Sequence, residues 1–200
     1  MSEQERWQTR FSAPDYIFGK APNAFLKAQA HRLRPGQTAL SVADGEGRNG
    51  VFLAEQGLDV LTIDYSPAAL AKAGALAAER GVRLRTEVAD VFTWRYPKAA
   101  FDVIAAIFIF AEPAERPAFF NNLKAALKPG GLLLMQGYRP QQLNYKTGGP
   151  PNAERMFTRA ILEAGFGDMA ELDINEHDSV ISEGTAHVGL SALIDLVARK

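Results

Sequence analysis

The chain has 200 residues, of which 47% are hydrophobic and 22% charged, so it holds enough apolar material for one sizeable core. Its net charge of -1 disfavours a nucleic-acid substrate, because nucleic-acid-binding proteins usually carry a basic surplus. The lack of cysteine excludes disulfides and thiolate metal sites, the three histidines match no metal spacing, and no apolar run is long enough for a membrane span, so we expect a cytoplasmic protein without metal or membrane contact.

The first part of the chain, residues 1–35, is expected to be an arm followed by a helix. The polar and charged start of the arm is unlike a signal peptide. Residues 7–18 contain aromatics but no strong helix or strand pattern of their own. A helix is expected from about Asn23 to Leu33, between Pro22 and Pro35.

Alternating apolar and amphipathic segments follow the arm. We expect strands over residues 38–43, 59–63 and 83–89. Helices are expected between them, from about Asn49 to Gln56 and from Ser66-Pro67 to about Arg80, where serine caps the helix and proline suits its first position. This alternation predicts strand–helix units over a parallel sheet.

The second half of the chain continues the pattern and then departs from it. Residues 101–108 form a continuous apolar run, typical of a strand buried on both faces. A helix over 114–127, a strand over 132–137, a long loop over 138–152 and a helix over 153–164 are expected next. The apolar segments 169–174 and 190–198 suit an antiparallel pair at the sheet edge. Residues 1–200 are therefore expected to form one α/β domain of Rossmann-like type, a mostly parallel sheet with helices on both faces.

Three loops after the predicted strands carry the candidate binding residues. The glycines of the segment from Asp44 to Gly50 permit close approach of a ligand to the backbone. Asp64 follows about twenty residues later, where a carboxylate can accept bonds from both ribose hydroxyls. Asp90 can face an adenine amino group. These features predict an adenosine-containing cofactor, although a plain tight turn and two helix caps also explain them, and the glycine spacing alone does not reject NAD.

The quoted motifs resemble class I S-adenosylmethionine-dependent methyltransferases. The resemblance lies in Ser41-Val42-Ala43-Asp44-Gly45-Glu46-Gly47-Arg48-Asn49, Ile63-Asp64-Tyr65-Ser66, Ala89-Asp90-Val91, Phe101-Asp102-Val103-Ile104 and Leu127-Lys128-Pro129-Gly130-Gly131. The Gly-Arg-Asn turn and the aromatic arm before it are similar to the branch of tellurite-resistance and thiopurine methyltransferases. This resemblance implies seven strands ending in an antiparallel hairpin, S-adenosylmethionine as cofactor, and an N-terminal arm that covers it.

The same resemblance implies a set of cofactor-binding residues. They are Trp7, Arg10, Phe18, Gly19, Ala43, Asp44, Gly45, Gly47, Arg48, Asn49, Asp64, Tyr65, Ser66, Asp90, Val91, Phe92, Ile107 and Phe108. The chain departs from the class at Ser41, where an acidic residue usually contacts the methionine part of the cofactor, and at Ala43, where glycine is common. Asp44, three positions after Ser41, is a candidate substitute.

The methyl acceptor is expected to be a small molecule, such as a thiol, a thiopurine or an oxyanion of tellurium or selenium. His187 is a candidate general base, because histidine transfers protons near neutral pH, and Tyr138 a second catalytic candidate. Tyr145 and Glu183 are candidate substrate contacts, and residues 138–152 a substrate loop. The alternatives are a non-catalytic module that binds S-adenosylmethionine and a nicotinamide-dependent oxidoreductase. Either a monomer or a homodimer is compatible with the sequence.

Overall fold

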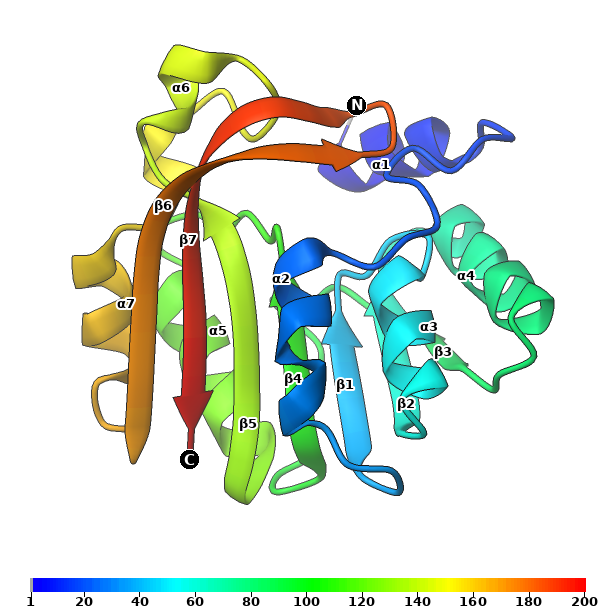
Figure 1. The fold of residues 1–200 in the computed structure, drawn as a ribbon, viewed down its shortest axis with the longest axis horizontal. Coiled ribbons are helices and arrows are strands. Elements are labelled where there is room, and N and C mark those ends of the chain that lie inside the picture. Colours follow the sequence, from blue (N-terminus) through cyan, green and yellow to red (C-terminus); the bar gives the residue numbers. More distant parts are fainter. Residues whose placement is uncertain (1) are drawn as a thin grey trace.

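A single sheet of seven strands forms the centre of the structure, a computed structural model that describes residues 2–200 (Figure 1). The strands are β1 (Thr38–Val42), β2 (Asp59–Asp64), β3 (Arg85–Val88), β4 (Phe101–Ile107), β5 (Leu127–Tyr138), β6 (Glu171–Glu183) and β7 (His187–Arg199). The helices are α1 (Glu3–Phe11), α2 (Ala24–Ala28), α3 (Arg48–Glu55), α4 (Pro67–Glu79), α5 (Arg116–Ala126), α6 (Gln142–Tyr145) and α7 (Arg159–Phe166), with short 3-10 turns η1 (Gln29–Arg32) and η2 (Ala153–Arg155).

The strand order β3-β2-β1-β4-β5-β7-β6 defines the fold class. The first five strands pair in parallel, whereas β7 runs antiparallel to both β5 and β6. The order reverses between β1 and β4, and ligands of such sheets bind outside the carboxyl ends of the strands at this switch point. The predicted Rossmann-like domain with a C-terminal antiparallel hairpin is confirmed.

Alternate residues of the central strands face two separate cores. Leu40 and Val42 of β1 pack into the core that includes α5 and α7, while Ala39 faces the core that contains Phe25 of α2 and Phe52 of α3. Helices therefore cover both faces of the sheet (Figure 1). Burial on both faces explains the unbroken apolar runs of these strands.

The β6–β7 hairpin extends beyond the end of β5, the strand with which β7 pairs. Its ladder runs from Glu171 opposite Arg199 to Glu183 opposite His187, whereas β5 pairs with β7 only as far as Leu193. The overhanging part curves over the carboxyl end of the sheet (Figure 1). The two strands are thus much longer than the expected segments 169–174 and 190–198, and the overhang brings Glu183 and His187 toward the switch point.

Three local expectations were wrong. The arm forms the helix α1, because Ser2 and Glu5 make a reciprocal capping box. The helix expected over 153–164 is divided into η2 and α7, because Met156 and Thr158 are extended. Between them, the buried Phe157 donates its N–H to the Tyr138 carbonyl. The expected loop 138–152 contains the short helix α6.

Candidate functional site

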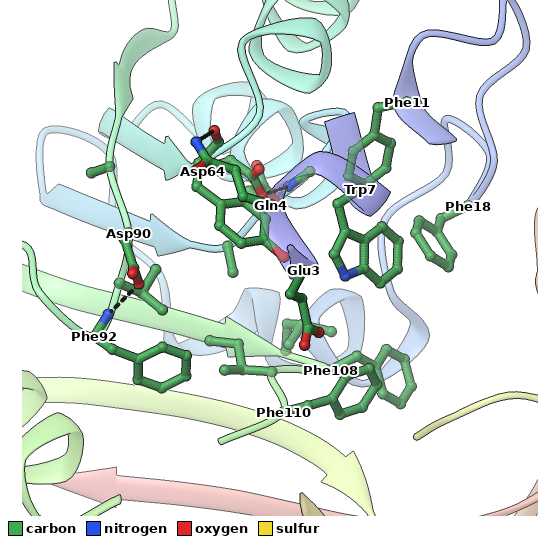
Figure 2. Close-up of a pocket in the computed structure, with 18 of the residues that line it drawn as sticks. Glu3, Gln4, Trp7, Phe11, Phe18, Asp64, Asp90, Phe92, Phe108 and Phe110 are labelled. Carbon is green, nitrogen blue, oxygen red and sulfur yellow. Dashed lines mark hydrogen bonds between the residues drawn. The ribbon is translucent and has the colours of Figure 1, made fainter. Parts of the chain in front are cut away.

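A cavity of about 360 Å³ opens at the carboxyl ends of the parallel strands (Figure 2). This volume lies within the range of small-molecule sites. Its walls come from the loops after β1, β2, β3 and β4, from α1, and from the start of β7. The lining residues are Glu3, Gln4, Trp7, Phe11, Phe18, Ala43, Asp44, Gly45, Arg48, Asn49, Asp64, Tyr65, Ala89, Asp90, Val91, Phe92, Ile107, Phe108, Ile109, Phe110, Glu112, Glu115, Arg155 and His187.

The turn after β1 is built on a buried carboxylate. The Gly45 N–H donates to Oδ2 of Asp64 over 2.9 Å, and the Ser66 N–H donates to Oδ1 over 2.9 Å. Gly45 has a φ of 59°, in the left-handed region that favours glycine. Asp64 therefore joins the turns after β1 and β2, and its oxygens keep further lone pairs for a ligand.

Burial also shifts the acidity of this carboxylate. It raises the pKa of Asp64 to about 6, although the hydrogen bonds from Ser66 and Gly45 favour the charged form. Burial likewise raises the pKa of Asp44, and the hydrogen bonds from Thr62 and Gly50 oppose that change. Two carboxyl groups at the strand ends thus carry perturbed pKa values, which are typical of functional sites.

Among the buried polar atoms of cavity-lining residues that have no hydrogen-bond partner within residues 2–200, two belong to residues that follow β1. One is Oδ1 of Asp44, whose Oδ2 accepts from Thr62 and Gly50 over 2.8 Å. The other is Nη1 of Arg48, whose Nη2 donates to Glu183 over 2.7 Å. Unsatisfied buried polar atoms are costly, so this acceptor and this donor, both on residues that line the cavity, are candidate contacts for a ligand that carries a cation and an anion.

Helix α1 closes one side of the cavity. Gln4 donates to the Tyr65 carbonyl, and Gln8 accepts from the Ser66 hydroxyl, so the helix is fixed to the turn after β2. Trp7 and Phe11 stack with centroids 5.2 Å apart and line the cavity, and Phe18 lies beside them (Figure 2). The first part of the arm is thus a helix that lines the cavity.

The inner end of the cavity is aromatic and holds His187. The His187 ring lies 4.6 Å from Phe18 and 4.8 Å from Phe108, centroid to centroid. Its Nδ1 is 3.7 Å from Oε2 of Glu183. Burial lowers the pKa of His187, so the ring is neutral near pH 7. A neutral imidazole can accept a proton.

Fifteen of the predicted site residues line the cavity, and seven do not. The fifteen are Trp7, Phe18, Ala43, Asp44, Gly45, Arg48, Asn49, Asp64, Tyr65, Asp90, Val91, Phe92, Ile107, Phe108 and His187. Of the other seven, Arg10 stacks on Trp7, and Ser66 caps α4. Gly47 and Gly19 permit close packing: a Cβ on Gly47 would lie 2.4 Å from that of Ala73, and one on Gly19 3.3 Å from the Gly184 nitrogen.

The remaining three were expected at the acceptor. Tyr138 is buried behind Phe108, against which it stacks at 4.7 Å. Glu183 is buried and paired with Arg48. Tyr145 lies on α6, where its hydroxyl donates to Asp178. Helix α6 and Thr147 of the segment 138–152 pack against β7, and no residue of this segment lines the cavity, so the expected substrate loop does not lie at the cavity.

Nine lining residues were not expected from the sequence, among them the charged residue Arg155. Arg155 of η2 lies 3.1 Å from Glu3 of α1 and 3.0 Å from Glu112. These ion pairs connect α1 to the opposite rim. No local pattern marks Arg155, whereas the Ser2–Glu5 capping box could have indicated α1.

Within residues 2–200, no helix is both long and apolar enough to cross a membrane. No group of three or more histidine or acidic side chains in that range is arranged to hold a metal ion.

Comparisons with known proteins agree with this geometry. Residues 39–131 match a family described as a methyltransferase domain. Phosphoethanolamine N-methyltransferase 1 of Triticum aestivum is 32% identical over 162 residues, which cover 76% of this chain and 31% of that protein. Demethylmenaquinone methyltransferase of Thermus thermophilus is 30% identical over 137 residues, 68% of this chain and 55% of that protein. The chain thus spans less than two thirds of either relative.

Solved structures share the fold across the whole chain. The N-methyltransferase NodS of Bradyrhizobium japonicum, in complex with S-adenosyl-l-homocysteine, superposes with a TM-score of 0.71 at 14% identity, covering 100% of this chain and 99% of that one. TehB of Haemophilus influenzae superposes with a TM-score of 0.70 at 17% identity, covering 98% of this chain and 66% of that one.

Proposed function

We propose that this chain, which carries a class I methyltransferase domain, transfers the methyl group of S-adenosylmethionine to a small-molecule acceptor. The observation that carries the proposal is the pair of unpartnered atoms in the cavity wall, Oδ1 of Asp44 and Nη1 of Arg48. An acceptor and a donor there match the amino and carboxylate groups of the methionine part. Asp44 thereby takes the role that an acidic residue at position 41 usually has.

The other end of the cavity suits the adenosine part. Asp64 would accept bonds from the ribose hydroxyls, and Asp90 with Phe92 would hold the adenine ring. Bound S-adenosylmethionine supplies a methyl group on a sulfonium, whose carbon–sulfur bond breaks, with its electron pair kept by sulfur, as the acceptor atom bonds to carbon. The chain's own contribution is alignment of acceptor and cofactor and exclusion of water by α1.

The acceptor end favours a thiol, a thiopurine or an oxyanion of tellurium or selenium. Phe18, Phe108 and Phe110 give it aromatic walls that suit a soft or planar acceptor. The structural match to TehB supports the tellurite-resistance branch only at the level of the fold. Labelled methyl transfer across a panel of thiols, thiopurines, tellurite, selenite and phenols tests the proposal. No transfer to any of them in a protein that binds the cofactor would favour a non-catalytic binding module.

Replacing Asp64 by alanine is expected to weaken binding of S-adenosylhomocysteine by at least tenfold. Hydrogen bonds to a charged acceptor contribute about 1.5–3 kcal/mol, which corresponds to roughly a ten- to hundredfold change in the dissociation constant. Isothermal titration calorimetry measures the dissociation constant, and circular dichroism establishes that the variant is folded. An unchanged dissociation constant in the folded variant would remove Asp64 from the site.

Binding of S-adenosylhomocysteine is also expected to weaken as the pH falls from about 7 to about 5. The pKa of Asp64 is raised to about 6, so its carboxylate takes up a proton in this range and loses acceptor capacity. The dissociation constant should rise roughly tenfold, and the Asp64→Ala variant should show no such rise. A rise of the same size in that variant would assign the pH dependence to another group, such as Asp44.

A further inference from the structure

A buried hydrogen-bond network lies behind the acceptor end of the cavity. Glu183 accepts from Nη2 of Arg48 over 2.7 Å at one oxygen and from Nδ2 of Asn23 over 2.9 Å at the other. These residues come from β6, α3 and the start of α2, and all three are buried. Both oxygens of the carboxylate are therefore held in place.

Asn23 is itself fixed by further bonds. Its side-chain oxygen accepts from the Leu26 N–H, its backbone N–H donates to Asn49, and its Nδ2 also donates to Gln136 over 2.7 Å. Gln136 in turn donates to Asp195 over 2.6 Å. These hydrogen bonds hold the Glu183 carboxylate in one orientation. A buried polar group that is fixed in this way can orient a neighbouring side chain.

The neighbour that Glu183 faces is His187. Nδ1 of His187 is buried, lies 3.7 Å from Oε2 of Glu183, and has no hydrogen-bond partner within residues 2–200. This separation is longer than a hydrogen bond, and such contacts often shorten only when substrate is bound. An ionised carboxylate can only accept, so it favours the tautomer with the proton on Nδ1. The lone pair then resides on Nε2, on the opposite side of a ring that lines the cavity.

We propose that Glu183 is a positioning residue that holds His187 with Nδ1–H toward its carboxylate and Nε2 toward the acceptor, so that His187 takes the proton of a neutral S–H or O–H acceptor. This inference rests on the proposed function and assigns its acceptor class. As the acceptor's sulfur or oxygen bonds to the methyl carbon, its proton goes to Nε2.

The surrounding charges favour a neutral acceptor over an ammonium ion. The guanidinium of Arg10 already covers the rings of Trp7 and Phe18, at 4.9 and 5.5 Å from their centroids. Nη2 of Arg48 donates to Oε2 of Glu183, the same oxygen that Nδ1 of His187 faces. The charged and titratable groups around His187 are thus Glu183 on β6, Arg48 on α3, Arg10 on α1 and Tyr138 on β5. An ammonium ion beside the His187 ring would meet these two guanidinium groups and one carboxylate that is already paired, whereas Glu3, Glu112 and Glu115 of the lining are not among the charges that shift the pKa of His187.

The first test uses the unsubstituted protein. Nitrogen-15 NMR of the His187 side chain should show a protonated Nδ1 and an unprotonated Nε2 near neutral pH. The opposite tautomer would overturn the proposal. Because this measurement needs no cofactor or acceptor, it separates failure of the inference from failure of the proposed function, which calorimetry with S-adenosylhomocysteine decides.

The second test is the substitution Glu183→Gln. Removing an opposite charge at this distance should lower the pKa of His187 by about 1–3 units, and the acidic limb of the turnover profile should move to lower pH with it. Glu183→Asp keeps the charge and should restore much of the pKa. Glu176→Gln is the same change at an exposed position of β6, and it should alter neither the pKa of His187 nor the pH dependence of turnover. An unchanged pKa of His187 in folded Glu183→Gln, or preferred methylation of amines over thiols and phenols, would contradict the proposal.

Discussion

Turnover is expected to fall by about 10²–10⁴-fold when His187 is replaced by alanine, with the dissociation constant for S-adenosylhomocysteine unchanged. General-base assistance has this size when the acceptor loses its proton during the reaction. Burial lowers the pKa of His187, so the neutral base is already present near pH 7. Steady-state kinetics with a thiol or phenol acceptor, together with calorimetry, measures both quantities.

The control for this variant is His31→Ala. His31 is exposed on η1, and its Nδ1 contacts only the carbonyl of Ala28. Its substitution should change neither turnover nor binding. If the acceptor is already an anion, His187→Ala should affect acceptor binding alone. Full activity of His187→Ala with every active acceptor from about pH 6 to about pH 9 would leave His187 with a packing role.

The second large effect is expected on stability, for Arg48→Ala in the protein without cofactor. Arg48 and Glu183 have side chains only 7% and 8% exposed, so loss of the guanidinium leaves a buried carboxylate without its charge partner. Removing one member of a buried pair costs about 3–5 kcal/mol in the free energy of unfolding. For a chain of this size, that change lowers the midpoint of thermal unfolding by roughly 6–20 °C.

Two further variants show whether burial is the cause. Arg85→Ala breaks an exposed pair with Asp59, where both side chains are more than half exposed, and should cost no more than about 1 kcal/mol. Replacing Arg48 and Glu183 together by methionine and leucine should recover much of the lost stability, because no unpaired charge remains. Equal melting temperatures for Arg48→Ala and Arg85→Ala would contradict a stabilising role for the buried pair.

The fold and the cofactor end of the cavity were predictable because they depend on local signals in chain order. The apolar runs of β1 and β4 specify buried strands, and Asp44, Asp64 and Asp90 follow three parallel strands directly. Parallel strands place their carboxyl ends on one edge, so these residues had to lie close together. Asp64 and the Gly45 turn do form hydrogen bonds there.

The acceptor end was not predictable in the same way. Glu183 and Arg48 are 135 positions apart in the sequence, and their contact depends on the length of the β6–β7 hairpin. Residues 175–183 alternate weakly in polarity because both faces of this overhang are partly exposed, so the sequence does not indicate how far the strand continues. Tyr145 and the segment 138–152 were expected at the cavity because the segment has the composition of a long loop, whereas α6 within it packs against β7.

The most direct test of the account is a calorimetric titration of the unsubstituted protein with S-adenosylmethionine, S-adenosylhomocysteine and NAD. We propose that the Asp44 and Arg48 atoms without partners bind the amino and carboxylate groups of the first two ligands. NAD has no α-amino acid group that could make these contacts. Saturable one-site binding of both S-adenosyl ligands, with none for NAD at the same concentration, is the predicted result. Saturable binding of NAD with none for S-adenosylmethionine would contradict the account.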